Sequence, residues 1–262
     1  MFDDVSRRVF LSLVPAAVAA PVMASGFQPA PLSAPGVFPA QDPDVVREIV
    51  AAAHGNVTRV KELVARRPAL ARAAWDWGYG DWETALGAAS HMGNREIAGI
   101  LLANGAHPTI FSAAMLGQLE SVKALVAASP GVQRTRGPHG ITLLAHARNG
   151  GAQEVVKYLE ALGDADVRYE NLPLAAEDQA AILGTYTFGA GPADRLTVKP
   201  NSRGDLTIQR DGGVERNLFH HGNRVFNPAG AEAVRIRFSG EPARASLLTV
   251  EDGDTVVTAR RA

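Results

Sequence analysis

The side chains best suited to chemistry in this sequence are its histidines, because imidazole exchanges protons near neutral pH and binds transition metals. The seven histidines are His54, His91, His107, His139, His146, His220 and His221. No two of them occupy positions i and i+4 of one expected helix, so the zinc-binding HExxH pattern is absent. Asp76 and Asp81 lack the density of oxygen ligands that a calcium loop needs. We therefore predict no metal site from the spacing.

Motifs that assemble catalytic groups are also absent. The sequence has no G-x-S-x-G nucleophile elbow, no phosphate-binding P-loop and no G-x-G-x-x-G after an expected strand. It contains no cysteine, which excludes thiolate nucleophiles, Cys-ligated zinc and iron–sulfur clusters. We expect a protein that is not an enzyme and uses no cofactor. One alternative stays open, a catalytic site between domains, which would require His139, Asp81 and His221 to converge.

A different kind of chemistry is indicated by the segment Trp75–Trp82, which holds all three tryptophans and Tyr79. Tryptophan and tyrosine provide large, rigid and amphipathic contact surfaces. Glycines between them would allow a tight loop, and Asp76, Asp81 and Glu83 would give that loop an acidic rim. The segment could bind an apolar or basic partner segment or a sugar ring. Equally, the rings could pack against the protein's own domains.

Composition places the chain among ordinary globular proteins, since 46% of its residues are hydrophobic and 20% are charged. The 26 basic and 27 acidic side chains give a formal charge of -1. Such a balance produces no overall attraction to nucleic acid or to anionic lipid. The length of 262 residues allows one large domain or two smaller ones.

Residues 1–24 have the pattern of an export signal. Arg7 and Arg8 precede an apolar run that is too short to span a bilayer, and small residues follow at a cleavage position. Ser6–Leu11 resembles the twin-arginine motif of bacterial proteins exported after folding, although Ser12 replaces a frequent lysine. The alternatives are an ordinary secretory signal and a buried N-terminal helix. A proline-rich linker is expected over residues 25–43, and a periplasmic or secreted location follows.

The elements that must position the histidines and tryptophans are paired helices, repeated over residues 44–172. Each turn glycine (Gly55, Gly93, Gly117 and Gly151) follows an alanine-rich stretch and precedes an apolar helix. The second helices should bury one stripe of side chains, formed by Val60, Leu63, Val64, Ile97, Ile100, Leu101, Val122, Leu125, Val126, Val155, Val156 and Leu159. A single pair cannot bury its stripe, so neighbouring pairs should stack as a solenoid.

This region resembles ankyrin-repeat proteins. The phrases Glu83–Ala89 and Ile141–Ala147 are similar to the family's T-P-L-H-x-A motif, and Leu101–Pro108 to the end of its second helix, although the motif's prolines and histidines are replaced. The resemblance implies about four repeats that bind another protein with their concave face, and an aromatic segment shaped as a β-hairpin finger. The residues expected to bind the partner are Trp75, Trp77, Tyr79, Asp81, Trp82, Glu83, His91, Met92, Met115, Leu116 and His139. Alternatively, the residues implied on the concave face only fill the solenoid.

Residues 176–262 change to an alternating pattern with turn residues between short segments. A short helix followed by about eight strands predicts an antiparallel barrel or sandwich. This part resembles, less specifically, the lipocalin-like β-barrel appended to exported β-lactamase-like serine hydrolases, through Leu183–Tyr186 and Val234–Phe238. The hydrolase domain is missing, so no activity is implied. A barrel of this size is filled by its own side chains or holds one apolar ligand.

The fold expected is therefore α+β and multidomain, with an N-terminal α-solenoid of about four ankyrin repeats and a C-terminal antiparallel barrel or sandwich of about eight strands. The function expected is that of an exported bacterial scaffold that binds another protein. The alternative is a periplasmic carrier of a small apolar ligand, held in the barrel or in a tryptophan-lined groove.

Overall fold

The computed structural model of the chain describes residues 40–191 and 193–262. The export signal expected over residues 1–24 and most of the expected linker lie outside these described residues. Gln41–Ala262 form one compact unit, which begins with helix α1 (Pro43–Ala52). Pro43 suits the first helical position, and the Asp42 carboxylate accepts a hydrogen bond from the Asp44 amide at 2.8 Å. Among the described helices, none has the length and apolar character needed to cross a membrane.

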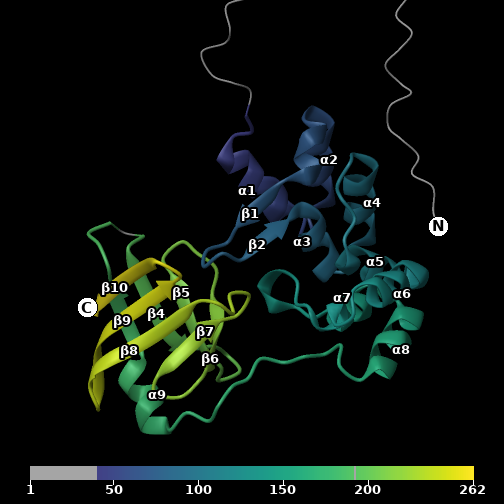
Figure 1. Cartoon of the computed structure of the whole chain (residues 1–262). Coiled ribbons are helices and arrows are strands. Elements are labelled where there is room, and N and C mark those ends of the chain that lie inside the picture. Colours follow the sequence, from purple (N-terminus) through teal and green to yellow (C-terminus); the bar gives the residue numbers. More distant parts are fainter. Residues whose placement is uncertain (1–39, 192) are drawn as a thin grey trace, which may run out of the picture. The chain divides into compact units, whose positions relative to one another are not determined.

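The described helices before the barrel come in four consecutive pairs (Figure 1). They are α1 with α2 (Val57–Arg66), α3 (Ala85–His91) with α4 (Arg95–Ala103), α5 (Ile110–Leu116) with α6 (Leu119–Ala128), and α7 (Leu143–Asn149) with α8 (Gln153–Leu162). The first helices pack side by side in chain order, α1 on α3, α3 on α5 and α5 on α7. Short 3-10 turns η1 (Pro68–Arg72), η2 (Val132–Arg134) and η3 (Pro138–Gly140) lie between the pairs.

The turn between α3 and α4 shows why the sequence places a glycine there. Gly93 has a φ of 68°, and a Cβ at this position would lie 2.1 Å from the Asn149 carbonyl oxygen. A side chain at Gly93 would therefore push the α3–α4 turn away from the end of α7, where Asn149 lies. The Asn94 side chain caps the following helix by accepting a hydrogen bond from the Ile97 amide at 3.0 Å.

Most residues of the expected apolar stripe lie in the core of this helical region, residues 43–162. The stripe residues that are buried are Val60, Leu63, Val64, Ile97, Leu101, Val122, Val155, Val156 and Leu159. The prediction is wrong for Leu125, which is 42% exposed, because α6 fully buries only Val122. Ile100 and Val126 are half-buried.

The aromatic segment forms a small hairpin, in which β1 (Ala74–Asp76) pairs with β2 (Trp82–Thr84) in antiparallel register. Trp75 lies opposite Glu83 in this register. Neighbouring residues of a strand point to opposite faces, and accordingly Glu83 is buried while Trp82 is exposed. The expected β-hairpin is confirmed.

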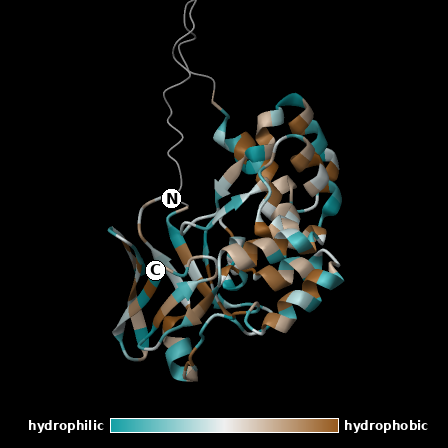
Figure 2. Ribbon diagram, turned by 45° about the vertical axis from the view of Figure 1, so that its right-hand side comes forward, coloured by the Kyte–Doolittle hydropathy of each residue, from teal (hydrophilic) through white to brown (hydrophobic). Residues whose placement is uncertain are grey.

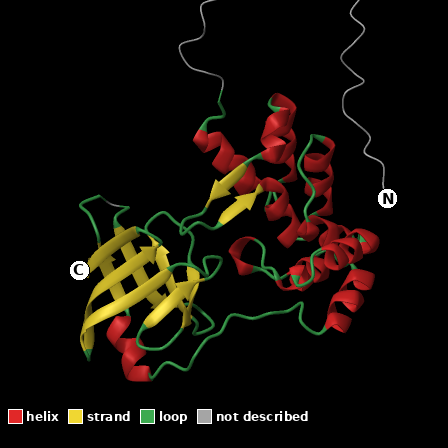
Figure 3. Ribbon diagram, in the orientation of Figure 1, coloured by secondary structure: helices red, strands yellow, loops and turns green. Residues whose placement is uncertain are grey.

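The C-terminal part is a closed antiparallel barrel of eight strands, preceded by α9 (Ala176–Ile182) (Figures 1 and 3). The strands are β3 (Gly184–Thr187), β4 (Arg195–Pro200), β5 (Leu206–Arg210), β6 (Arg216–His220), β7 (Val225–Pro228), β8 (Arg235–Glu241), β9 (Arg244–Asp252) and β10 (Thr255–Arg261). Each strand pairs with the next in sequence, and β10 closes the barrel against β3. The prediction of an eight-stranded antiparallel structure is confirmed.

Large apolar side chains occupy the inside of the barrel. Tyr186, Phe226 and Phe238 are buried there and meet edge to face, with ring centroids 5.6 to 5.7 Å apart. Ile182 of α9 joins the same core. Figure 2 shows hydrophobic and hydrophilic residues mixed along the barrel strands, as expected where one strand face points inward and the other outward. The packing favours the filled form of the barrel.

Candidate metal centre

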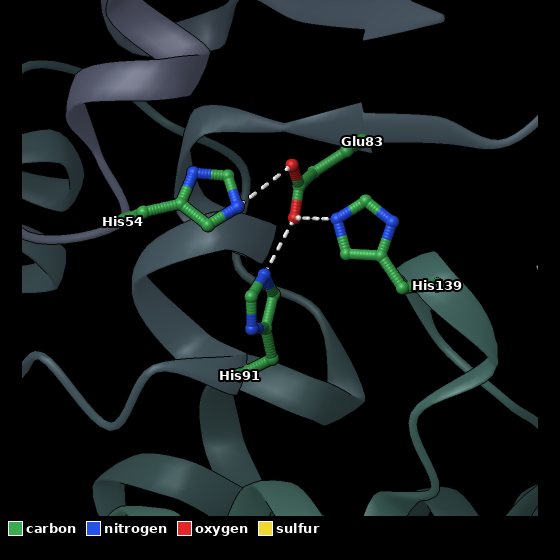
Figure 4. Close-up of side chains that lie close together, drawn as sticks. All are labelled: His54, Glu83, His91 and His139. Carbon is green, nitrogen blue, oxygen red and sulfur yellow. Dashed lines mark hydrogen bonds and ion pairs between the residues drawn. The ribbon is translucent and has the colours of Figure 1, made fainter. Parts of the chain in front are cut away.

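Four side chains with metal-binding atoms converge in the helical region (Figure 4). His54 follows the end of α1, Glu83 lies in β2, His91 is the last residue of α3, and His139 belongs to η3. One ligand atom from each residue lies within 4.8 Å of those of the other three. The set offers three imidazole nitrogens and one carboxylate, a donor combination typical of transition-metal sites.

The Glu83 carboxylate is the centre of this cluster. Its Oε1 lies 2.8 Å from the Nε2 of His91 and 3.4 Å from the Nε2 of His139. Its Oε2 lies 3.4 Å from the Nε2 of His54. Glu83 has no exposed side-chain surface, whereas the side chains of His54 and His139 are 31% and 23% exposed, so the cluster lies at the edge of the buried interior. All three histidines therefore point the same ring nitrogen at one buried carboxylate.

Outer hydrogen bonds fix the orientation of three of the four side chains. The Nδ1 of His54 lies 3.1 Å from the Val50 carbonyl oxygen, which can only accept, so this nitrogen donates. The Nδ1 of His139 lies 2.7 Å from the Asp81 carboxylate. The indole of Trp77 donates to Glu83 Oε2 at 2.7 Å. Partners of this kind leave Nε2 available to a metal and hold each ligand in place.

The backbone around His139 is strained in a way that serves its position. His139 has a φ of 60°, which is uncommon for a residue with a side chain, and Gly140 follows with a φ of 74°. The His139 amide donates to Asp81 Oδ1 at 2.9 Å, while its ring contacts Asp81 and Glu83. The uncommon backbone conformation of His139 therefore accompanies three polar contacts with the carboxylates of Asp81 and Glu83.

The charges in the cluster support one another. Burial would raise the pKa of Glu83, but hydrogen bonds from His139 and His91 outweigh burial and lower it to about 2. Burial would lower the pKa of His139, but hydrogen bonds to Asp81 and Glu83 raise it to about 9. At neutral pH and without metal, Glu83 is ionised and His139 is positively charged, with a hydrogen on both ring nitrogens. A bound cation could replace the hydrogen on Nε2.

Most of the residues expected to bind a partner are less accessible than the sequence suggested. Trp82 and Met92 are 65% and 53% exposed. Trp75, Trp77, Tyr79, Leu116 and His139 are half-buried. Asp81, Glu83, His91 and Met115 are buried, so they offer no surface to a partner. The expectation of an acidic rim at Asp81 and Glu83 is wrong, because both carboxylates turn inward to histidines.

The tryptophans divide between the two roles that the sequence left open. Trp75 and Trp77 pack against the core of the first helix pairs, and Tyr79 packs against the core of the barrel. These rings therefore have the structural role, whereas Trp82 remains available to solvent. A groove of about 820 Å³ runs beside the hairpin and is lined by Trp75, Trp77, Tyr79 and Phe188, among others.

The spacing of histidines along one helix did not predict this cluster, because its four residues come from different elements. The signal that could have found it is positional. His54 and His91 lie one and two residues before a turn glycine, and Glu83 and His139 lie one and three residues before a threonine that caps a helix. Because the first helices of successive pairs pack side by side, residues near their ends can meet. His221, proposed with His139 and Asp81 for a catalytic site, instead contacts Asn227 at 2.5 Å.

Comparisons with known proteins add little to this geometry. No family model and no curated protein matches the chain. The solved structures that match in part include two of SurE. "Crystal structure of SurE" has 23% identity and a TM-score of 0.26, and the match covers 45% of this chain and 27% of that one. "Crystal structure of SurE with D-Leu" has 27% identity and a TM-score of 0.25, with 43% and 28% covered. The chain thus matches about a quarter of these proteins' length, and the low TM-scores carry no argument.

Proposed function

We propose that this protein binds a divalent transition-metal ion through His54, Glu83, His91 and His139. The observation that carries the proposal is the convergence of three Nε2 atoms and one carboxylate within 4.8 Å. A buried carboxylate faces three imidazoles, and two of these, His54 and His139, have their outer nitrogens engaged by other groups, which is the composition of a metal site with supporting contacts. We assign no reaction to this centre.

Zinc is the ion that the donor set and its spacing favour. Tetrahedral zinc with bonds of about 2.1 Å places its ligand atoms about 3.4 Å apart. The Oε1 of Glu83 lies 3.4 Å from His139 and 2.8 Å from His91, and its Oε2 lies 3.4 Å from His54. The four ligand atoms lie within 4.8 Å of one another, so zinc would need only small shifts of these side chains to bind all four. Nitrogen and oxygen donors without thiolate also suit Fe²⁺, Mn²⁺ and Ni²⁺, which serve as competitors in a test.

The test is a titration of the metal-free protein with zinc, followed by calorimetry and by elemental analysis after dialysis. We expect one zinc ion per chain, and no stoichiometric binding in His91→Ala or Glu83→Gln. His107→Ala is the matched control, because His107 is exposed and lies outside the cluster. Wild-type protein that retains no zinc, or variants that retain it fully, would overturn the proposal.

A second proposed function rests on the sequence resemblance. We propose that residues 44–172 are an ankyrin-repeat array in an exported protein that binds a partner protein. The exposure of Trp82 and Met92 supports a contact surface there. A pull-down from periplasmic extract tests it: loss of a specific partner in a Trp82→Ala, Met92→Ala variant supports the surface. Capture that is equal in wild type and variant contradicts it.

Export through the segment 1–24 is part of this proposal and rests on Arg7 and Arg8. Replacing both by lysine should leave the protein in the bacterial cytoplasm if the twin-arginine route is used. Unchanged export of that variant would favour an ordinary secretory signal.

The carrier alternative is supported by the groove rather than by the filled barrel. Its aromatic and apolar lining suits a small apolar ligand. Native mass spectrometry of protein purified without denaturation should then show a bound species that Trp75→Ala loses. A ligand-free spectrum at all concentrations would count against the carrier.

A further inference from the structure

Asp81 stands out because it joins the proposed metal centre to the barrel. Its side chain is 2% exposed and accepts hydrogen bonds from two parts of the chain. From the helical region come the amide and the Nδ1 of His139, at 2.9 and 2.7 Å. From the barrel comes the Nη1 of Arg216 in β6, at 2.6 Å. Asp81 is thus a buried carboxylate held by contacts from both the helical region and the barrel.

The contact between Asp81 and His139 determines which imidazole nitrogen faces the centre. An ionised carboxylate only accepts hydrogen bonds, so the Nδ1 of His139 must carry its hydrogen. The Nε2, 3.4 Å from Glu83, is then the atom that can bind a metal. A carboxylate in this place also increases the basicity of the imidazole, which strengthens its bond to a metal.

The barrel holds the Asp81 carboxylate from its other side. Arg216 is 4% exposed, and its Nη1 also donates to the Ala229 carbonyl oxygen at 2.9 Å. Gly230 leaves room for Asp81, since a Cβ there would lie 2.9 Å from the carboxylate. The Tyr79 ring lies 5.9 Å from the Arg216 guanidinium and packs on the barrel core. Asp81 is therefore enclosed, and Arg216 holds its Oδ2 in addition to the contacts from His139.

We infer that Asp81 is a positioning residue of the metal centre, and that Arg216 of the barrel acts on the centre through it. This inference rests on the proposed metal-binding function and deepens it. Metal affinity then depends on a contact made by the barrel. Because coupling between two sites is reciprocal, bound metal should in turn strengthen the contact between Asp81 and Arg216.

The test compares zinc dissociation constants of Asp81→Asn, Arg216→Met and the double variant with wild type. Asparagine keeps the shape but removes the charge, so we expect about a 10- to 100-fold weaker affinity. Arg216→Met should weaken binding by a smaller factor, because the Asp81 carboxylate then keeps only its contacts with His139. In the double variant the loss should equal that of Asp81→Asn alone, since Arg216 acts only through Asp81.

Two controls separate positioning from general damage. Asp76→Asn alters the same hairpin, where Asp76 accepts a bond from the Gly78 amide, and should leave zinc affinity unchanged. Nitrogen-15 NMR of the metal-free protein at a pH above 9, where His139 is neutral, should show its hydrogen on Nδ1 in wild type and partly on Nε2 in Asp81→Asn. Circular dichroism checks that each variant folds. If Asp81→Asn does not fold, the zinc affinity of Arg216→Met tests the inference instead.

The outcomes are distinct. If wild type binds zinc and both variants bind it equally well, the positioning role is overturned while the metal centre stands. If losses in the double variant simply add, Arg216 does not act through Asp81. If wild type binds no zinc, the proposed function itself fails.

Discussion

The helical region and the barrel each surround a charged side chain with polar groups, and they do so differently. In the barrel, Arg261 donates to the carbonyl oxygens of Ala245, Leu183 and Ala181 at 2.5 to 2.6 Å, and to the Tyr186 hydroxyl at 2.9 Å. In the helical region, Glu83 is surrounded by three imidazoles. Carbonyl oxygens are fixed acceptors, whereas imidazoles can release a proton and bind an ion. The contacts of Arg261 with fixed acceptors therefore indicate a structural role, whereas the contacts of Glu83 with imidazoles indicate a binding site.

The strongest test of this contrast is the effect of zinc on stability. Zinc at a thousandfold excess over its dissociation constant should raise the free energy of unfolding by about 4 kcal/mol. Glu83→Gln should show no such rise. Urea unfolding with and without zinc measures both, and His107→Ala should behave as wild type. Equal stabilisation of wild type and Glu83→Gln would mean that zinc binds elsewhere.

Loss of the Arg261 side chain tests the barrel side of the comparison. Arg261→Met leaves buried acceptors without donors and should lower the free energy of unfolding by about 3 kcal/mol. The zinc dissociation constant should stay the same, because Arg261 has no contact with the centre. Arg260→Met, on the exposed side of the same strand, is the matched control. A change in zinc affinity would contradict the separation.

The dependence on pH should have opposite signs for stability and for metal binding. His139 has a folded pKa of about 9 against 6.5 when unfolded, so its contribution is complete below pH 6.5 and is lost as pH rises through 9. Glu83, lowered from 4.5 to about 2, contributes above pH 4.5 and loses this as pH falls through 2. Metal-free stability should thus fall between pH 6.5 and 9.

Over the same interval zinc affinity should rise, since the metal displaces the His139 proton. Unfolding curves and zinc titrations at pH 6, 7.5 and 9 would show whether the two trends diverge. In His139→Gln the loss of metal-free stability above pH 6.5 should disappear. If the free energy of unfolding of metal-free wild type does not change between pH 6.5 and 9, His139 is neutral in the folded protein.

The smallest effects concern two tryptophans of the hairpin, Trp77 in its loop and Trp82 at the start of β2. Trp77→Phe removes the indole donor to Glu83 and should weaken zinc binding about 10-fold. Trp82→Phe changes an exposed ring and should leave both zinc affinity and stability within about 0.5 kcal/mol of wild type. Calorimetry distinguishes the two, and equal effects would remove Trp77 from the supporting contacts.

Much of the fold follows from local patterns. Alternating residues with turn signals predicted the barrel strands, because strand faces differ in burial. Alanine-rich stretches with turn glycines predicted the helix pairs, and Gly93 shows the close contact that requires them. The predicted burial of Leu125 is wrong because an apolar pattern does not show how much of a helix its neighbours cover.

The candidate site could not be predicted in the same way. Its four ligands lie far apart in sequence, at His54, Glu83, His91 and His139, and only tertiary packing brings them together. Each residue alone fits a solvent-facing turn, which is the commoner role of a turn histidine. Asp81 and Glu83 seemed a surface rim for the same reason, since a carboxylate in a loop is usually solvated.

The hydrogen bond between the Trp77 indole and Glu83 gives the protein a built-in optical reporter. An ion bound to Glu83 changes the electric field at the indole nitrogen and so should shift its emission. Trp82 contributes a solvent-exposed background that Trp82→Phe removes, while Trp75, in the opposite strand, contributes a second signal. Occupancy of the centre could therefore be followed in dilute solution without any label.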